Sequence, residues 1–210
     1  MGDRPQPQTQ SAPSANSMQP PLYGVHHSAR PTWKLRDTVQ FYRDKLGLKL
    51  IHTISARGWG REGHPDFLHF FFDAGEGATI AFFYYIGTER PDWLEQRNNH
   101  LYRSTHTAWR VKTRDELVAW KEKLESVGIE VSPYTQHEAI ESIYFHDPNG
   151  YNLEVTWQMR SFNELDAEDA RLSLEAAMQI EDEVGHAKSM KDIDSVWRRK
   201  AKLLEAHVAE

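Results

Sequence analysis

The chain of 210 residues contains no cysteine, which excludes a disulfide scaffold, a thiolate metal site and a cysteine nucleophile. It also has no apolar run near the ~18–20 residues that a membrane-spanning helix needs, so we expect no membrane contact. Positive charge is scarce: 25 Lys and Arg against 31 Asp and Glu give a net charge of −6, which argues against nucleic acid as a partner. Residues Met1–Pro21 lack the apolar stretch of a signal peptide, and we expect a cytoplasmic protein. The chain is instead rich in groups suited to chemistry, with 11 His, 7 Trp, 8 Tyr and 9 Phe.

Composition divides the chain into three parts. Residues 1–21 are rich in Pro, Gln, Ser and Ala and cannot bury enough apolar surface to offset the entropy of ordering, which predicts a disordered tail. Residues 22–158 have the pattern of a folded domain. Residues 159–210 are rich in Ala, Glu, Leu and Lys without Pro, which predicts a helical extension of two helices divided near Gly185.

Within residues 22–158 one order of elements occurs twice, with modules at about 22–88 and 104–158. In the first module we expect a helix over Leu35–Leu46 and a hairpin of strands His69–Asp73 and Ala78–Tyr85. In the second we expect a strand, a helix with Thr113 as its N-cap, and three further strands: Thr105–Lys112, Arg114–Val127, Ile129–Tyr134, Ile140–His146 and Asn152–Trp157. The spacing of ~80 residues indicates a duplicated module, because it is too long for a solenoid repeat.

Three polar residues stand at matching strand positions. His27 lies in the first strand of the first module, His106 takes the same place in the second module, and Glu154 lies in the final strand. If these strands line one cup, two imidazoles and one carboxylate meet on one face of a metal ion and leave other positions open, as in non-haem Fe(II) oxygenases. Taken singly, each of these residues has a simpler explanation: a hydrogen-bonded polar side chain in the fold, or a side chain that faces solvent. His26 should point away from His27, because side chains alternate along a strand.

The chain resembles the vicinal oxygen chelate superfamily, which includes glyoxalase I, bleomycin-resistance proteins and type I extradiol dioxygenases. The resemblance covers about residues 22–157 and rests on Val25-His26-His27 followed by Phe41–Leu48, on His106–Val111, and on Asp147-Pro148-Asn149-Gly150 with Leu153-Glu154. It implies an α+β fold of two βαβββ modules that close into one metal-binding cup. It also implies a homodimer, for which the C-terminal helices are candidate contacts.

One stretch is similar to the extradiol ring-cleavage signature at each fixed position: Thr135, His137, Ile143-Tyr144, Asp147-Pro148, Gly150 and Glu154. The resemblance implies that His27, His106 and Glu154 bind Fe(II), with Mn(II) as the alternative metal. It implies that His137 and Tyr144 lie beside the substrate. A phenol and an imidazole suit this role, since each can hydrogen-bond a catecholate oxygen and move a proton.

The chain differs from the family pattern in two ways that bear on its chemistry. Glyoxalase I-like members use a fourth ligand, a Glu late in the first module, and Ala81 stands at that position here. Alanine cannot bind a metal, which favours oxygen chemistry over isomerisation. The acid/base His of ring-cleaving members also has no counterpart at its usual place, where Pro91 and Asp92 stand; His69 and His100 are the candidate substitutes, with His69 ahead.

The sequence therefore predicts an extradiol-type dioxygenase that cleaves the ring of a small aromatic diol with O₂. Two alternatives stay open: a lyase or isomerase that uses a divalent metal as Lewis acid, and a resistance-type protein that binds a small molecule without turning it over. Fold alone does not choose among them, because the superfamily contains all three.

Overall fold

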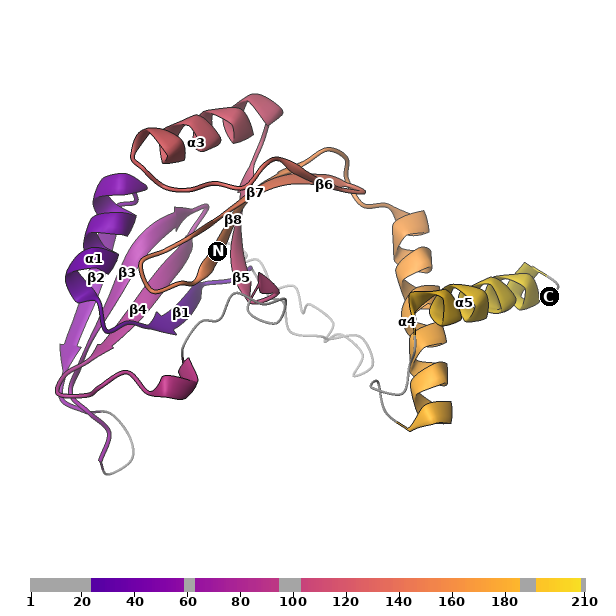
Figure 1. Ribbon diagram of the computed structural model, residues 1–210, viewed down its shortest axis with the longest axis horizontal. Helices are drawn as coiled ribbons and strands as arrows, with labels where there is room; N and C mark the ends of the chain where they lie inside the picture. The colour runs from indigo at the N-terminus through magenta and orange to yellow at the C-terminus, as the bar shows by residue number, and fades with distance from the viewer. Residues whose placement is uncertain (1–23, 59–62, 95–102, 186–191, 209–210) are drawn as a thin grey trace, which may run out of the picture. The chain divides into compact units, whose positions relative to one another are not determined.

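Residues 24–58, 63–94, 103–185 and 192–208 are described by the computed structural model (Figure 1). They belong to two units: unit 1 comprises Met1–Asn98 with Asp147–Gly150, and unit 2 comprises Asn99–His146 with Tyr151–Glu210. The predicted tail at residues 1–21 and the candidate His100 lie outside the described residues. None of the described helices is both long and apolar enough to cross a membrane.

Unit 1 contains a four-stranded mixed sheet in the order β1-β4-β3-β2. Strand β1 pairs with β4 in parallel, and the other two pairings are antiparallel. Its elements are β1 (His27–Pro31), α1 (Leu35–Val39), the π-helical turn η1 (Gln40–Lys45), β2 (Leu50–Ala56), β3 (Phe67–Gly75), β4 (Ala78–Tyr85) and the short 3₁₀ turn η2 (Asp92–Leu94). The expected helix and hairpin are confirmed, although the helix passes from α to π geometry at Gln40.

The two faces of this sheet differ because side chains alternate along each strand. On one face the rings of Phe72 and Phe82 pack against Tyr42 of η1, at centroid distances of 5.5 and 4.8 Å, and all three side chains are buried. The opposite face carries His27, His69 and other rings, which are described below. An aromatic core thus holds η1 on one side of the sheet and leaves the histidine face to the other side.

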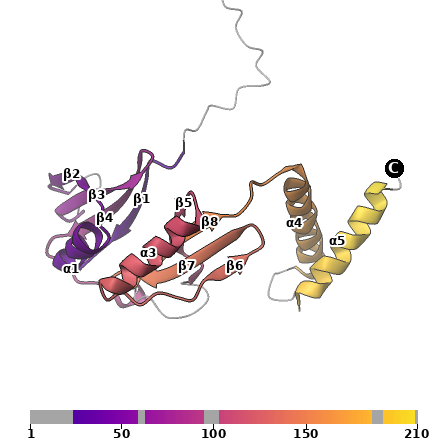
Figure 2. The same ribbon diagram turned by 90° about the horizontal axis from the view of Figure 1, so that it is seen from above.

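Unit 2 repeats this topology, with a sheet in the order β5-β8-β7-β6 and β5 parallel to β8. Its elements are β5 (His106–Val111), α3 (Arg114–Ser126), β6 (Thr135–His137), β7 (Ile140–His146) and β8 (Asn152–Gln158). Helix α3 lies along one face of the sheet (Figure 2), where Leu117 and Leu124 are fully buried. The duplicated α+β module expected from the sequence is confirmed.

The ends of α3 follow from its sequence. Thr113 is the N-cap as predicted: its hydroxyl accepts a hydrogen bond from the Glu116 amide, and the Glu116 carboxylate accepts one from the Thr113 amide. This reciprocal capping box satisfies two amides that the first helical turn leaves without partners. Gly128 follows the helix with a φ of 76°, a conformation that glycine adopts without strain.

The strand expected at Ile129–Tyr134 is wrong. The segment pairs with no strand of the sheet as a ladder, and β6 begins only at Thr135. The Ser132 amide donates to the Tyr144 carbonyl, but the Tyr144 amide donates to the Ser132 side chain instead of to a backbone carbonyl. Pro133 then follows and has no amide hydrogen to donate. A regular ladder therefore cannot form here.

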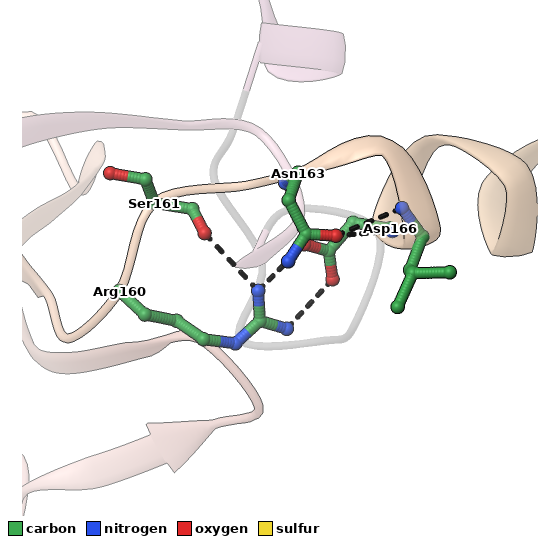
Figure 3. Close-up of polar contacts among 5 residues, drawn as sticks. Arg160, Ser161, Asn163 and Asp166 are labelled. Atoms are coloured by element: carbon green, nitrogen blue, oxygen red, sulfur yellow. Dashed lines mark hydrogen bonds and ion pairs between the residues drawn. The ribbon is translucent and has the colours of Figure 1, made fainter.

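Two C-terminal helices are present as expected, α4 (Glu164–Val184) and α5 (Ile193–Val208), and α4 ends at Gly185 in the left-handed conformation. Figure 3 shows the start of α4, where the Asn163 side chain accepts hydrogen bonds from the amides of Leu165 and Asp166. The Asp166 carboxylate accepts from the Asn163 amide and forms an ion pair with Arg160. The carboxylate also favours the helix because it lies at the positive end of the helix dipole.

The turn Asp147–Gly150 belongs to unit 1, although the strands on either side of it belong to unit 2. Tyr42 donates a hydrogen bond to the buried Asp147 carboxylate at 3.1 Å, and Thr32 and Thr38 each form one with the Asn149 side chain. The motif that marks the end of the second module in the sequence is therefore bound to η1 and its surroundings. The closing of the two modules into one cup, and the boundary of the domain at residue 158, stay predictions.

Candidate metal centre

Four of the predicted site residues form a line across the sheet of unit 2, one from each strand. His106 comes from β5, Glu154 from β8, Tyr144 from β7 and His137 from β6, in the order in which these strands pair. Tyr144 and Glu154 are direct neighbours in the register of β7 and β8, so they lie on the same face. The face is the one opposite to α3, because the alternate residues Ile143, Leu153 and Val155 are buried in the core.

Hydrogen bonds join the four side chains into one chain. His106 Nε2 lies 2.9 Å from Glu154 Oε2. The Tyr144 hydroxyl donates to Glu154 Oε1 at 3.3 Å and lies 3.0 Å from His137 Nε2. The four polar side chains therefore stand within hydrogen-bond distance of one another along the whole line.

Glu154 is the buried member of the group, with 3% of its surface exposed. A carboxylate removed from water is costly unless charges or hydrogen bonds compensate it. The Tyr144 hydroxyl supplies one such hydrogen bond. Burial raises the pKa of the Tyr144 phenol, and the nearby Glu154 charge raises it further. Tyr144 therefore keeps its proton at neutral pH and acts as a donor.

The arrangement fits a cation between His106 and Glu154. His106 Nδ1 lies 2.9 Å from the Arg103 carbonyl, which only accepts, so Nδ1 carries a hydrogen and Nε2 is the nitrogen directed at the carboxylate. Two electron-rich atoms 2.9 Å apart need a proton or a metal ion between them. Adjacent N and O ligands with bonds of about 2.1 Å at right angles stand about 3.0 Å apart. The pair already has the spacing of two ligands of one ion.

The histidine face of unit 1 is aromatic. The His69 ring lies flat on Phe83 at a centroid distance of 3.7 Å and contacts Phe71 at 4.2 Å. His27 lies 6.2 Å from His69 and 5.8 Å from Phe71, measured between ring centroids. The structure thus brings the predicted ligand His27 and the candidate acid/base residue His69 together on one face.

His69 is held as a neutral base. It is 5% exposed, and its Nδ1 lies 3.1 Å from the Phe82 carbonyl, so Nδ1 carries the hydrogen and Nε2 keeps its lone pair. Burial lowers the pKa of His69; the Phe82 carbonyl opposes this effect, and the positive charges of His27 and His52 add to it. The ring is therefore uncharged at neutral pH and can accept a proton at Nε2.

The expectation that His26 points away from His27 is wrong. The two Nδ1 atoms are 2.9 Å apart and the rings meet edge to face. Strand β1 begins only at His27, so His26 lies outside the region in which side chains alternate.

The registers of the two sheets confirm the alignment of the modules. In unit 2 His106 begins β5, and Ala108, two residues later, pairs with Glu154. In unit 1 His27 begins β1, and Ala29, two residues later, pairs with Ala81. Ala81 is therefore the counterpart of Glu154 within its own sheet, and unit 1 contains one of the predicted ligands where unit 2 contains two.

That His27, His106 and Glu154 bind one metal ion together stays a prediction. His106 and Glu154 lie in unit 2 and His27 in unit 1. In the described part of either unit alone, no three His, Asp or Glu side chains are gathered closely enough to hold an ion.

Sequence analysis missed three groups that position the site residues. The Arg103 carbonyl orients His106, the Phe83 ring stacks on His69, and the Ser132 hydroxyl fixes the Tyr144 amide. The pairing of β3 with β4 could have indicated Phe83, since it lies directly across from His69. A backbone carbonyl before a strand carries no signal in the sequence.

Comparison with known proteins places the chain in a family. Residues 24–155 match the model of the Glyoxalase/Bleomycin resistance protein/Dioxygenase superfamily. A search of curated proteins finds no match.

Solved structures with similar folds include a glyoxylase/bleomycin resistance protein/dioxygenase domain from Frankia sp. EAN1pec, with a TM-score of 0.50, 19% identity, and coverage of 68% of this chain and 96% of that one. A lactoylglutathione lyase from Agrobacterium tumefaciens has a TM-score of 0.46 and 22% identity, with coverage of 65% and 95%. A mutant of the fosfomycin resistance protein FosX from Listeria monocytogenes, complexed with Mn(II) and 1S,2S-dihydroxypropylphosphonic acid, has a TM-score of 0.45 and 19% identity, with coverage of 67% and 95%. With the duplicated module, the register of its strands and the match over residues 24–155, this chain belongs to the Glyoxalase/Bleomycin resistance protein/Dioxygenase superfamily.

Proposed function

We propose that this protein is a metal-dependent extradiol-type dioxygenase that cleaves the ring of a catechol-like diol with O₂. The observation that carries the proposal is the chain of hydrogen bonds from His137 through Tyr144 to Glu154 and His106. It joins two metal-binding side chains to two proton-carrying ones. A diol substrate bound at the metal needs both kinds of group within reach.

The proposed ligands are His27, His106 and Glu154, with Fe(II) as the metal and Mn(II) as the alternative. Two nitrogens and one oxygen form the donor set of non-haem Fe(II) oxygenases, and an ion held by these three residues would have positions open for a diol and O₂. The place of Ala81 as the counterpart of Glu154 supports three protein ligands, since the methyl group cannot provide a fourth.

The side chains of unit 2 would act on the substrate oxygens. Tyr144 keeps its proton, so its hydroxyl can donate a hydrogen bond to an oxygen on which negative charge develops. His137, in contact with the same hydroxyl, can replace or remove that proton. In unit 1, His69 Nε2 is the proposed acceptor of a diol proton. His100 remains a second candidate for this role and lies outside the described residues.

A Lewis-acid lyase or isomerase is the second candidate function, because the His106 and Glu154 pair suits any divalent ion that prefers N and O ligands. Such an enzyme needs the metal and a base but consumes no O₂. A resistance-type binding protein would need neither the metal nor turnover. These differences decide the experiment.

The test is anaerobic reconstitution with Fe(II), followed by catechol or 2,3-dihydroxybiphenyl in air, with O₂ uptake and the yellow ring-opened product as readouts. We expect one equivalent of iron per chain and one O₂ consumed per product. Iron binding without O₂ uptake for either diol, or with turnover that continues without O₂, would contradict the dioxygenase and favour the Lewis-acid enzyme. A chain that binds no iron would contradict both and leave the binding protein.

Glu154→Ala and His106→Ala should each abolish iron binding and turnover together, because each removes a ligand. Glu141→Ala is the matched control: Glu141 is a carboxylate on the neighbouring strand β7 that pairs with Arg114 at 2.9 Å. It should bind iron as the unmodified chain does. An iron-loaded and active Glu154→Ala variant would remove the basis of the proposal.

A further inference from the structure

His26 stands directly before the proposed ligand His27 and contacts its ring. The two Nδ1 atoms lie 2.9 Å apart, and the ring planes meet at 86°. The backbone of His26 is held as well, because its carbonyl accepts hydrogen bonds from the amide and the hydroxyl of Thr79 on β4, at 2.9 and 3.2 Å. The residue that carries the second ring is therefore anchored to the sheet beside His27.

His27 is a residue whose orientation burial does not fix. It is exposed, and its ring meets the Phe71 ring edge to face at a centroid distance of 5.8 Å. An exposed histidine can turn about its side-chain bonds, and its ring offers two different nitrogens. The group that binds one ring nitrogen therefore decides whether the other nitrogen is available to a metal ion.

The equivalent histidine of unit 2 has such a group. His106 Nδ1 lies 2.9 Å from the Arg103 carbonyl, and its Nε2 is directed at Glu154. His27 begins β1 as His106 begins β5, and the strand registers place the two histidines at equivalent positions. In unit 1 the partner of Nδ1 is the His26 ring instead of a carbonyl. The two modules thus hold their histidines by the same nitrogen and through different groups.

The short contact between the two rings contains one hydrogen when both rings are neutral. If His27 Nδ1 carries it, His26 Nδ1 accepts the hydrogen bond, and His27 Nε2 keeps its lone pair for a metal ion. If His26 Nδ1 carries it, the hydrogen of His27 is on Nε2, which then has no lone pair to offer. Metal binding through Nε2 and acceptance by His26 therefore favour each other.

We propose that His26 is a positioning residue for metal binding: its Nδ1 accepts a hydrogen bond from His27 Nδ1 and thereby directs His27 Nε2 at the ion. The role rests on the proposed assignment of His27 as a ligand, and it applies to a dioxygenase and to a Lewis-acid enzyme alike. His26 acts through His27 and contacts neither the ion nor the substrate.

Titration of the full chain with Co(II), without diol and without O₂, tests the role through the visible absorption of the bound ion. His26→Leu removes the acceptor and keeps a side chain of similar size. It should raise the Co(II) dissociation constant about 10- to 100-fold, as is typical when the hydrogen-bond partner of a ligating histidine is lost. His26→Asn should recover most of the affinity, because the Asn side-chain oxygen can accept the same hydrogen bond.

His64→Leu is the matched control. His64 is also an exposed histidine of unit 1, but its Nδ1 lies 3.0 Å from the Pro65 carbonyl. Its Co(II) affinity should equal that of the unmodified chain, and far-UV circular dichroism verifies that each variant is folded. An unchanged affinity in His26→Leu, or an equal loss in His26→Asn, would overturn the role of His26 and leave the proposed function standing. An unmodified chain that binds no Co(II) would contradict both.

Two further readouts separate positioning from direct binding by His26. We expect one equivalent of Co(II) per chain in the unmodified protein; two equivalents that fall to one in His26→Leu would make His26 a ligand and overturn the proposal. In the Zn(II)-loaded chain, nitrogen–proton correlation spectra of the imidazole rings should place the hydrogen of His27 on Nδ1. A hydrogen on Nε2 would show that the metal binds through Nδ1, where the proposal places His26.

Discussion

Glu154 is both a buried carboxylate and a proposed metal ligand. Its carboxylate is buried between β5 and β7, and its two oxygens face different partners, His106 and Tyr144. The Tyr144 hydroxyl donates a hydrogen bond to one oxygen and His106 Nε2 faces the other, while the sheet holds all three side chains in register.

Tyr144→Phe separates the proton-carrying role from metal binding. The substitution removes the hydroxyl that contacts Glu154 and His137 and leaves the ring in place. We expect turnover of the diol to fall about 10²-fold or more, with iron content unchanged. Tyr134→Phe is the control, because Arg114 and Lys121 lie over the face of the Tyr134 ring, which the substitution keeps. A Tyr144→Phe enzyme as active as this control would exclude the assigned role.

At the scale of residues, the sequence was most informative where a pattern recurs. The equivalence of His27 with His106 and the place of Ala81 could be predicted because both modules repeat one spacing, and the strand registers agree. The contact of His26 with His27 could not, because it depends on where the strand begins. The contact of His69 with Phe83 depends on the pairing of two strands, which a residue pattern does not fix.

At the scale of elements, capping boxes mark the starts of α3 and α4. Thr113 and Glu116 form a reciprocal pair that starts α3, and both residues lie on the surface, where packing contributes little. The helix then carries Leu117 and Leu124 into the core. The start of the helix and its packing were both predictable, since capping and periodicity are local properties of the chain.

Thr113→Ala should lower the free energy of unfolding by about 1 kcal/mol, because the Glu116 amide loses its acceptor. Urea denaturation followed by circular dichroism measures the change. Thr113→Ser restores the hydroxyl and should recover most of the stability. If Ala and Ser are equally stable at this position, the capping hydrogen bond is not what stabilises α3.

The cap of α4 should depend on pH. Arg160 and the Asn163 amide lower the pKa of Asp166 to about 2, below the value of about 3.9 for a free Asp. A carboxyl whose pKa is lowered in the folded state stabilises that state above the unfolded pKa, and the effect is lost as the pH falls through about 2. Carboxyl chemical shifts should show Asp166 titrating near 2, and Arg160→Gln should move this pKa upward. A midpoint near that of a free Asp in the unmodified chain would contradict the ion pair.

The prediction of elements failed where strand formation depends on pairing with residues distant in the sequence. Residues Ile129–Tyr134 have the apolar and β-branched composition of a strand, yet the Ser132 side chain takes the place of a backbone partner and Pro133 follows it. The sequence pattern does not indicate strand β2 at Leu50–Ala56. Most of its residues are exposed, so its sequence lacks the clear alternation of a half-buried strand.

At the scale of the whole molecule, the duplicated topology was predictable. The distribution of aromatic and polar side chains between the two units was predictable only in part. Unit 1 offers an aromatic face with His27 and His69, and unit 2 offers a polar face with His106, Glu154 and Tyr144. Spacing indicated which strands carry the polar groups. It could not indicate that the turn after β7 is bound within unit 1.

Tyr42→Phe tests the attachment of this turn. The hydroxyl of Tyr42 is buried and donates to the buried Asp147 carboxylate, so its removal leaves a charged acceptor with one partner fewer. We expect a loss of about 1–3 kcal/mol in the free energy of unfolding, measured in urea by tryptophan fluorescence. Tyr84→Phe, on β4, should change it by less than about 0.5 kcal/mol, as is usual away from such features. Equal effects of the two substitutions would show that the hydrogen bond contributes nothing.

The same turn determines how the protein could be divided into fragments. A chain cut between β4 and β5 would leave the N-terminal fragment without Asp147 and Asn149, and the hydroxyls of Tyr42, Thr32 and Thr38 would lose the hydrogen bonds that join them to this turn. The C-terminal fragment would present the same loop with nothing to bind it. Two genes made by such a split would therefore encode halves that are each incomplete, and that regain their native contacts only when they are produced together.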